Sequence, residues 1–514
     1  MGPRLNSLLA VLAILAISLS LWQLTADKAG LQIEEISIGD TPATVFRPEG
    51  GQQVGPVVVI AHGFAGSQQL MQPFAITLAR NGYVAVTFDF LGHGRHPDPL
   101  GGDVGDPDGS SLLLLRQLDQ VVTHAMAQGA GGKIALLGHS MASDIVVRYA
   151  KDHEARVAAT VAVSMYSPAA DATGPHNLLV ITGALESDGL KREALRAVGA
   201  GGAGRTDPPQ WEQTYGQFND GSARRAVLAD GVEHVGVLFA RESMEEAARW
   251  LDRAFDRGDG TVVTLRWGPW VILLLLGVLV LAKPLSSRLP ALGGEPLGAN
   301  LTWRQFLPAA LVPAVATPLL LWVAPHDFLA VIAGDYLAAH FLAYGLISAA
   351  VLYWLRRRRV EPQPVRPIPS LKLIGVAGLI GAYMLVGFGL SIDQFITNFW
   401  PDAGRAPLLV ALIAGALVYF TADEWLARGG DAPRGGYWLA KLFFLGSLAA
   451  AVALDPDGLF FLLILVPVIV PVFLVVGLVS RWCYLRTRHP IPAGIAGALL
   501  MGWAIGVTFP ILTG

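Results

Sequence analysis

The second half of the chain is a succession of long apolar runs. They begin at Trp267 and are separated by short polar stretches. Inside a bilayer every backbone N–H and C=O must be satisfied within the protein, so apolar runs of this length are typical of membrane-spanning helices. We expect eight such helices, at 267–282, 306–324, 328–355, 371–392, 407–426, 437–454, 459–483 and 491–511.

The composition supports a large membrane part. Of the 514 residues, 53% are hydrophobic and only 15% are charged, which is too apolar for a soluble protein. The chain is also too long for a single domain. A net charge of -3 gives no basic field for nucleic acid, so we expect no nucleic-acid partner. Because Cys483 is the single cysteine, an internal disulfide and a thiolate metal cluster are excluded.

A further apolar run, 6–24, lies behind Arg4 near the N-terminus. It fits an uncleaved signal anchor or a cleaved signal peptide. The large side chain of Leu24 stands where a signal peptidase needs a small residue, so we favour an anchor over residues 1–26. In either case the residues that follow are sent across the membrane.

Charges in the connecting loops predict the topology. Alternate loops are basic, and the loops between them carry acids with a single base, Arg405. The positive-inside rule then places the basic loops and Arg4 in the cytoplasm. We expect an integral protein of the plasma (inner) membrane with an extracytoplasmic domain at 27–266 and a transmembrane domain at 267–514. The bases concerned are Lys283, Arg288, Arg304, Arg356 to Arg359, Arg366, Lys372, Arg428, Arg434, Lys441, Arg481, Arg486 and Arg488.

Residues 27–266 have the pattern of a soluble α/β domain. Short apolar runs predict strands at 32–38, 43–47, 57–61, 84–88, 134–137, 157–163, 178–182 and 225–228. Helical patterns between them include 73–81, 112–127 and 242–255. Strands that alternate with helices predict a mainly parallel sheet flanked by helices. Only 165–177 separate two of these strands, so we expect a site without a cap domain, either open or covered by the membrane or by the Gly-rich segment 198–204.

One stretch of this domain carries a chemical signature. The strand at 134–137 ends in Gly138-His139-Ser140-Met141-Ala142, and a helical pattern follows. A serine on such a sharp turn needs small residues two positions before and after it. The stretch resembles the G-x-S-x-G nucleophile elbow of the α/β-hydrolase superfamily (serine esterase/lipase-like), with alanine in place of the last glycine.

The resemblance implies an α/β-hydrolase fold over about residues 31–255 and a catalytic triad in the order nucleophile, acid, histidine. Ser140 would be the nucleophile. Glu186, three residues after Gly183, would be the acid, with Asp188 as the alternative because aspartate is the commoner acid. His234, in a Gly-x-x-His setting before the last helix, would be the base.

Two more motifs support the resemblance. A His-Gly turn at 61–67 follows a buried strand, and 89–94 read Asp-Phe-Leu-Gly-His-Gly after the next strand. By analogy with the family, the backbone N–H groups of Phe64 and Met141 would form the oxyanion hole. The membrane spans lie outside the resemblance.

Other ionisable residues have structural explanations. His139 precedes the serine on the turn and is more simply its neighbour than a base. His62, His93 and His96, with Asp98, resemble a set of metal ligands, but the first two occupy positions that shape the backbone in the family, so we expect no metal. Asp335 and His340 lie in an apolar span, where ionisable groups are costly. Five positions apart on a helix, they point about 140° away from each other.

The sequence thus predicts a membrane-embedded serine hydrolase that cleaves carboxylic esters, lipid-linked ones included, through an acyl-enzyme. It needs no metal or organic cofactor, and its partners are the acyl-ester or lipid substrate and membrane lipids; no protein partner is predicted. The alternative is a transporter or lipid-handling membrane protein whose outer, hydrolase-like domain has no catalytic role.

Overall fold

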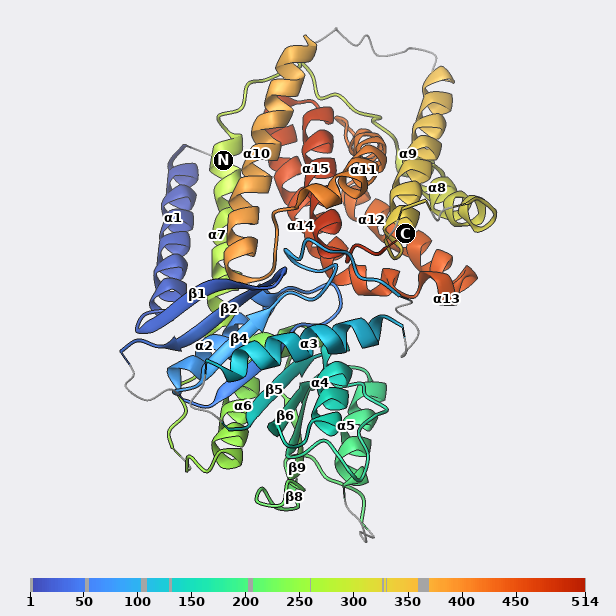
Figure 1. Cartoon of the computed structure of the whole chain (residues 1–514). Coiled ribbons are helices and arrows are strands. Elements are labelled where there is room, and N and C mark those ends of the chain that lie inside the picture. The colour runs from blue at the N-terminus through green and yellow to red at the C-terminus, as the bar shows by residue number, and fades with distance from the viewer. Residues whose placement is uncertain are drawn as a thin grey trace.

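The chain forms a helical bundle stacked on an α/β domain (Figure 1). The structure is a computed structural model. It describes residues 3–50, 55–102, 109–128, 132–201, 207–258, 260–325, 328–329, 331–358 and 369–513.

The α/β domain is built on one sheet, which has nine strands in the part of the chain described. Its central strands are parallel, whereas the pairs β1·β2, β2·β4 and β8·β9 are antiparallel. All eight expected strands are present; β8 was missed because two residues show no alternation. The spatial order is β1 (Leu31–Ile38), β2 (Thr41–Pro48), β4 (Val84–Phe88), β3 (Val57–Ala61), β5 (Ile134–His139), β6 (Val157–Val163), β7 (Leu178–Gly183), β9 (Arg224–Ala229) and β8 (Thr214–Tyr215).

Helices cover both faces of this sheet. Alternate residues of β3 enter different cores: Val58 and Ile60 join one, Val57 and Val59 the other, as the two-residue period of a strand requires. The first core includes α2 and α6, and the second includes α3 and α4. The helices are α2 (Gln72–Arg80), α3 (Ser110–Met126), α4 (Met141–Asp152), α5 (Asp188–Ala200) and α6 (Arg241–Ala254).

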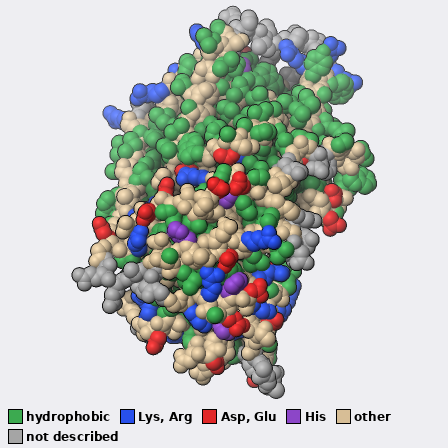
Figure 2. Space-filling model, viewed as in Figure 1, with side chains coloured by type: hydrophobic (Ala, Val, Ile, Leu, Met, Phe, Trp, Pro, Cys, Tyr) green, Lys and Arg blue, Asp and Glu red, His purple; other side chains and the backbone are tan. Residues whose placement is uncertain are grey.

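The bundle contributes the apolar part of the molecule. Among the described residues, nine helices are long and apolar enough to cross a membrane, eight of them after the α/β domain. Figure 2 shows hydrophobic side chains gathered over the bundle, with charged and histidine side chains over the α/β domain. These helices are α1 (Pro3–Ala26), α7 (Trp267–Ser286), α8 (Trp303–Val323), α9 (Gly334–Arg357), α10 (Ser370–Phe395), α11 (Ala406–Ala427), α12 (Gly436–Leu454), α14 (Leu462–Thr487) and α15 (Ile491–Thr508).

Close packing holds the bundle together. A Cβ added to Gly415 of α11 would lie 2.3 Å from the carbonyl oxygen of Ala338 on α9, so only glycine allows this approach. Helix α1 packs on α7, where a Cβ on Gly277 would meet Ile17 at 2.8 Å. Small residues at such crossings are the usual means of helix association in membranes.

Three bases that the sequence assigned to loops are held by the protein instead: Lys441 and Arg405 are buried, and Arg428 is largely covered. Lys441 lies inside α12 and forms an ion pair with Asp423 of α11. Arg428 follows α11, and its Nε lies 2.9 Å from Oε2 of Glu424. Arg405, the single base of the acidic loops, is also buried. Because the positive-inside rule counts bases of the loops, the expected topology depends on the remaining loop bases.

Two span boundaries also differ from the expectation. The span expected at 328–355 begins only at Gly334, because the carboxylate of Asp335 accepts the backbone N–H groups of Phe328, Leu329 and Tyr336. The span expected at 459–483 begins at Leu462 and ends at Thr487 as α14, and a short helix, α13 (Pro456–Leu459), precedes it.

Polar contacts join the bundle to the α/β domain. The loop after β4 provides most of them: Arg95 Nη2 lies 2.8 Å from Oδ2 of Asp393 at the end of α10. In the same loop the carbonyl oxygen of Gly94 accepts a hydrogen bond from Asn398 Nδ2, and that of Gly92 accepts one from Arg405 Nη2, each at 3.1 Å. The loop therefore fixes the domain against one end of the bundle.

Candidate active site

The turn between β5 and α4 has the strained conformation that its sequence predicts. Ser140 has φ 52° and ψ -117°, a region that non-glycine residues rarely occupy. A Cβ at Gly138 would lie 2.5 Å from the carbonyl oxygen of Ala142, so the turn needs glycine there. The methyl group of Ala142 is fully buried, so alanine fits at the last position.

Ser140, His234 and Glu186 form a continuous hydrogen-bonded chain. Nε2 of His234 lies 2.8 Å from Oγ of Ser140, and Nδ1 lies 3.1 Å from Oε2 of Glu186. An ionised carboxylate can only accept, so Nδ1 carries the proton and Nε2 is left free to accept the serine proton. The three residues follow β5, β7 and β9, whose carboxyl ends meet at one edge of the sheet.

The carboxylate of Glu186 is held ionised. Its Oε1 accepts hydrogen bonds from Ser164 Oγ at 2.6 Å and from the backbone N–H of Gly183 at 2.8 Å. Burial alone would raise the pKa of Glu186, but the hydrogen bonds from His234, Ser164 and Gly183 outweigh burial and lower this pKa below its ordinary value.

Asp188, the alternative acid, lies elsewhere. It is exposed at the first position of α5, after the N-cap residue Ser187, and it makes no described contact with His234. A carboxylate there stabilises the helix by its interaction with the helix dipole. The structure thus brings Glu186, and not Asp188, to the histidine.

The other histidines hold the backbone in place. Nε2 of His139 lies 2.9 Å from the carbonyl oxygen of His234, and burial lowers the pKa of His139 to about 3. His62 accepts the backbone N–H of Phe90 at 3.0 Å, and burial lowers its pKa as well. His93 Nδ1 lies 2.8 Å from the carbonyl oxygen of Leu91, and burial lowers its pKa to about 3. These rings are therefore neutral structural groups near neutral pH.

No metal cradle is present in the described part of the chain, where no three His, Cys, Asp or Glu side chains are grouped as ligands. His96 is occupied otherwise, because its Nδ1 accepts the backbone N–H of Asp98 at 3.1 Å.

Comparison with known families identifies the domain. The model of the family described as "Serine aminopeptidase, S33" matches residues 52–185, which include β3 to β7 and the Ser140 turn. The domain is an α/β hydrolase. Helices α7 to α15 lie outside the match. A search of curated proteins gives no significant match.

The solved structures that resemble this chain are distant in sequence. An epoxide hydrolase from Vigna radiata is 13% identical, with 45% of this chain and 100% of that chain covered and a TM-score of 0.31. A CIB-like hydrolase from Thermoplasma acidophilum is 15% identical over 44% and 98% of the two chains, with a TM-score of 0.32. A thioesterase domain from the curacin biosynthetic pathway is 24% identical over 26% of this chain, with a TM-score of 0.21. This chain spans only 44% of that domain's length. Likenesses of this size carry no argument about activity.

Two backbone N–H groups of the hydrolase domain lie beside the nucleophile. Met141 is the first residue of α4, so the helix leaves its N–H without a partner. The turn that bears Phe64 packs directly on the serine, because a Cβ at Gly63 would lie 3.0 Å from the Cβ of Ser140. Among the described residues the N–H of Phe64 makes no hydrogen bond. Both groups are available to an oxyanion.

The turn that bears Phe64 also contacts the bundle. The ring of Phe64 lies 4.9 Å from the ring of Phe461, between α13 and α14. Phe460, Tyr166 and Leu185 are exposed large side chains on the segments around it. The contact joins residues almost 400 positions apart in the chain, and no local sequence signal predicts it. Of the segment 198–204, residues 198–200 end α5, residue 201 caps this helix, and 202–204 lie outside the described residues.

The ionisable groups of the spans are paired within the bundle. The carboxylate of Asp335 accepts backbone N–H groups at the start of α9. His340 is buried, and its Nε2 lies 3.2 Å from Oγ of Ser447 on α12. The ion pairs of Lys441 with Asp423 and of Arg428 with Glu424 were not foreseen as a cluster, although Asp423 and Lys441 stand near the ends of neighbouring spans in the sequence.

Proposed function

We propose that this chain is a membrane-embedded serine hydrolase that cleaves carboxylic esters through an acyl-enzyme. The observation that carries the proposal is the chain Ser140–His234–Glu186, with distances of 2.8 and 3.1 Å. A nucleophile in hydrogen-bond reach of a base, with the base oriented by a third group, is the arrangement that activates a serine hydroxyl.

In the first half of the reaction, Oγ of Ser140 forms a bond to the ester carbonyl carbon while Nε2 of His234 takes its proton. Glu186 stabilises the imidazolium, and the N–H groups of Met141 and Phe64 stabilise the negative oxygen. The C–O bond to the alcohol then breaks, and His234 returns the proton to the leaving oxygen. In the second half, water repeats the sequence and releases the acid.

We infer that the acyl group is long or lipid-linked. The support is the location of the mouth: Phe64 contacts Phe461 of the bundle, and Phe460 and Leu185 leave apolar surface exposed beside it. An acyl chain that leaves the bilayer at this point stays in apolar surroundings up to the nucleophile.

We also infer that the hydrolase domain faces the extracytoplasmic side of the plasma (inner) membrane. Figure 2 shows Lys and Arg side chains at the end of the bundle farthest from this domain. Arg356 and Arg357 end α9 there and are exposed. The positive-inside rule assigns that end to the cytoplasm.

The alternative, a transporter or lipid-handling protein, has less support. Its candidate residues have structural partners: Asp335 accepts three backbone N–H groups, and His340 contacts Ser447. The hydrolase domain, in contrast, contains a complete set of groups for acyl transfer.

A series of p-nitrophenyl esters tests the proposal. The wild-type protein in detergent should hydrolyse them, with kcat/KM rising from acetyl to dodecanoyl, and Ser140→Ala should abolish turnover. A folded wild-type protein that hydrolyses none of the series would refute ester hydrolysis.

A further inference from the structure

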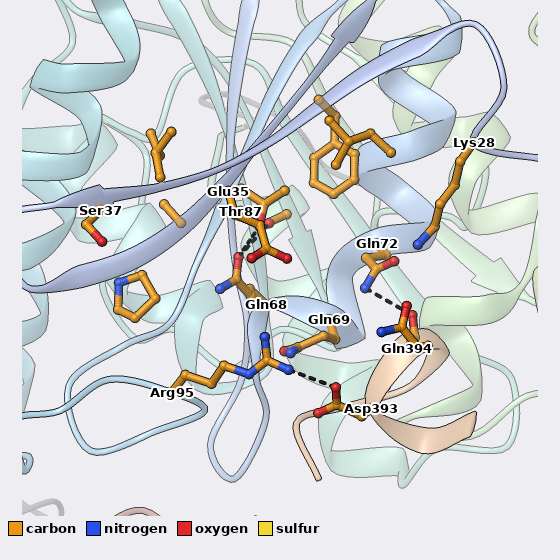
Figure 3. A pocket seen from close by; sticks show the side chains of 16 residues that line it. Lys28, Glu35, Ser37, Gln68, Gln69, Gln72, Thr87, Arg95, Asp393 and Gln394 are labelled. Carbon is orange, nitrogen blue, oxygen red and sulfur yellow. Dashed lines mark hydrogen bonds and ion pairs between the residues drawn. The ribbon is translucent and has the colours of Figure 1, made fainter. Parts of the chain in front are cut away.

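A second polar pocket lies between the hydrolase domain and the bundle, apart from the Ser140 site. It has a volume of about 330 Å³, and its walls are β1, β2, the turn η1 (Gln68–Met71) and the end of α10 (Figure 3). None of its lining residues belongs to the chain Ser140–His234–Glu186. The proposed hydrolysis therefore leaves this pocket without a role.

The pocket lies where three apolar helices end. Lys28 comes two residues after α1, and Asp393 lies in the last turn of α10. The ammonium of Lys28 is 5.9 Å from the ring of Trp267, which begins α7, and 5.6 Å from the ring of Phe395. Aromatic rings beside a lysine at helix ends are typical of the membrane–water interface, where lipid headgroups lie.

Some polar groups of the pocket are already used by the protein. Arg95 Nη2 is paired with Asp393 at 2.8 Å, and Arg95 Nε lies 3.2 Å from Oδ1 of Asn398. Gln68 donates to Asp89 and accepts from Thr44 at 2.8 Å. These contacts hold the walls together.

Other groups of the pocket make no hydrogen bond with the described residues. Gln69 is 7% exposed, and its Oε1 is buried without a hydrogen bond, as is Oε1 of Gln72. No hydrogen bond is recorded for the ammonium of Lys28 or for Nη1 of Arg95, which points into the pocket in Figure 3. Because a buried polar atom without a partner is costly, the amide oxygens of Gln69 and Gln72 indicate a polar occupant.

The unused groups specify both signs of charge. Lys28 and Nη1 of Arg95 are donors suited to a phosphate. The carboxylate of Glu35, on β1, and the amide oxygens of Gln69 and Gln72 are acceptors suited to an ammonium, which only donates. In the view of Figure 3, Glu35 and Lys28 lie apart with Gln72 between them.

We propose that this pocket binds the headgroup of a zwitterionic phospholipid that carries a phosphate and a primary ammonium. Lys28 and Arg95 hold the phosphate, and Glu35, Gln69 and Gln72 hold the ammonium. The acyl chains lie along the lipid-facing side of the adjoining helices, where Trp22 of α1 and Leu390 of α10 are exposed. The lipid thereby links α1 and α10 to the sheet.

Native mass spectrometry of the full chain in detergent tests this proposal. The probes are dioctanoyl phosphatidylethanolamine, dioctanoyl phosphatidylglycerol, which lacks the ammonium, and glycerophosphoethanolamine, which lacks the acyl chains. The ethanolamine lipid should bind about tenfold more tightly than the glycerol lipid, as expected for a charge-assisted hydrogen bond. Equal affinity for the two lipids would refute the ammonium site, and equal binding of the soluble probe would refute the lipid as the ligand.

Variants locate the site. Lys28→Ala should lower the affinity for both lipids about tenfold. Glu35→Gln should lower only the affinity for the ethanolamine lipid, also by about tenfold. Glu34→Gln is the matched control, because Glu34 is the next residue of β1 but pairs with Arg47 outside the pocket. Affinities unchanged in both Lys28→Ala and Glu35→Gln would overturn the proposal. Ester hydrolysis by these variants should equal that of the wild type, so failure of this site is distinguishable from failure of the catalytic one.

Discussion

The ring of Phe64, whose backbone N–H faces the Ser140 site, lies 4.9 Å from the ring of Phe461 in the membrane part. One aromatic contact thus joins the candidate oxyanion hole to the segment that precedes α14. Through the same contact, the segment that follows β3 packs on the helical bundle.

Removal of this contact should affect long substrates first. Phe461→Ala should lower kcat/KM for dodecanoyl esters about three- to tenfold, because an aromatic pair contributes about 0.5–1.5 kcal/mol. Acetyl ester turnover should change little. Phe328→Ala, which removes an exposed phenyl ring from the segment before α9, is the control. An equal loss for short and long esters would mean that the contact supports folding and not acyl binding.

Glu186 and Asp188 should differ sharply in their effect on catalysis. Glu186→Gln removes the negative charge that stabilises the imidazolium, so kcat should fall by about 10³- to 10⁴-fold. Asp188→Asn, in the exposed first turn of α5, should leave kcat within about twofold of the wild type. Steady-state kinetics on an activated ester checks both variants. The reverse order of effects would show that the observed geometry is not the catalytic one.

The buried histidines make the hydrolase domain sensitive to acid. Burial lowers the pKa of His93 and of His139 to about 3, so the folded state resists protonation while the unfolded chain takes up protons below about pH 6.5. Stability should be complete above pH 6.5. As the pH falls from 6.5 toward 3, each histidine should lower the free energy of unfolding by about 1.4 kcal/mol per pH unit.

Thermal unfolding between pH 8 and pH 4 measures this effect. The midpoint temperature of wild-type unfolding should fall steeply below pH 6.5. The midpoint temperature of His93→Gln should fall less steeply over the same range, whatever its value at pH 8. Parallel curves for the two proteins would show that the His93 ring does not account for the loss.

The membrane histidine distinguishes the two functions proposed for the chain. If hydrolysis is the activity, His340→Gln should retain ester turnover within about threefold, since His340 contacts Ser447 inside the bundle and not the substrate. A cellular assay that Ser140→Ala leaves intact and His340→Gln abolishes would favour transport instead.

Local sequence patterns were sufficient for part of this site. The Ser140 turn follows from a strand end and the small residues Gly138 and Ala142, whereas the order of Ser140, Glu186 and His234 was implied by the resemblance to α/β-hydrolases. The sequence did not decide between Glu186 and Asp188, because the loop after β7 determines which carboxylate turns toward the histidine.

The sequence did not predict the contacts between segments that are far apart in the chain. The ion pair of Lys441 with Asp423 converts an expected loop charge into a buried one, and the contact of Phe64 with Phe461 has no periodic signal. The polar pocket is likewise built from β1, η1 and α10, which meet only in the folded chain.

The most direct test of the central claim is labelling of the purified membrane protein with a fluorophosphonate probe, read by intact mass. We expect a single adduct on wild type and none on Ser140→Ala or His234→Ala, because only a serine activated by His234 attacks the probe. No adduct on folded wild type, or an adduct that persists in Ser140→Ala, would contradict it.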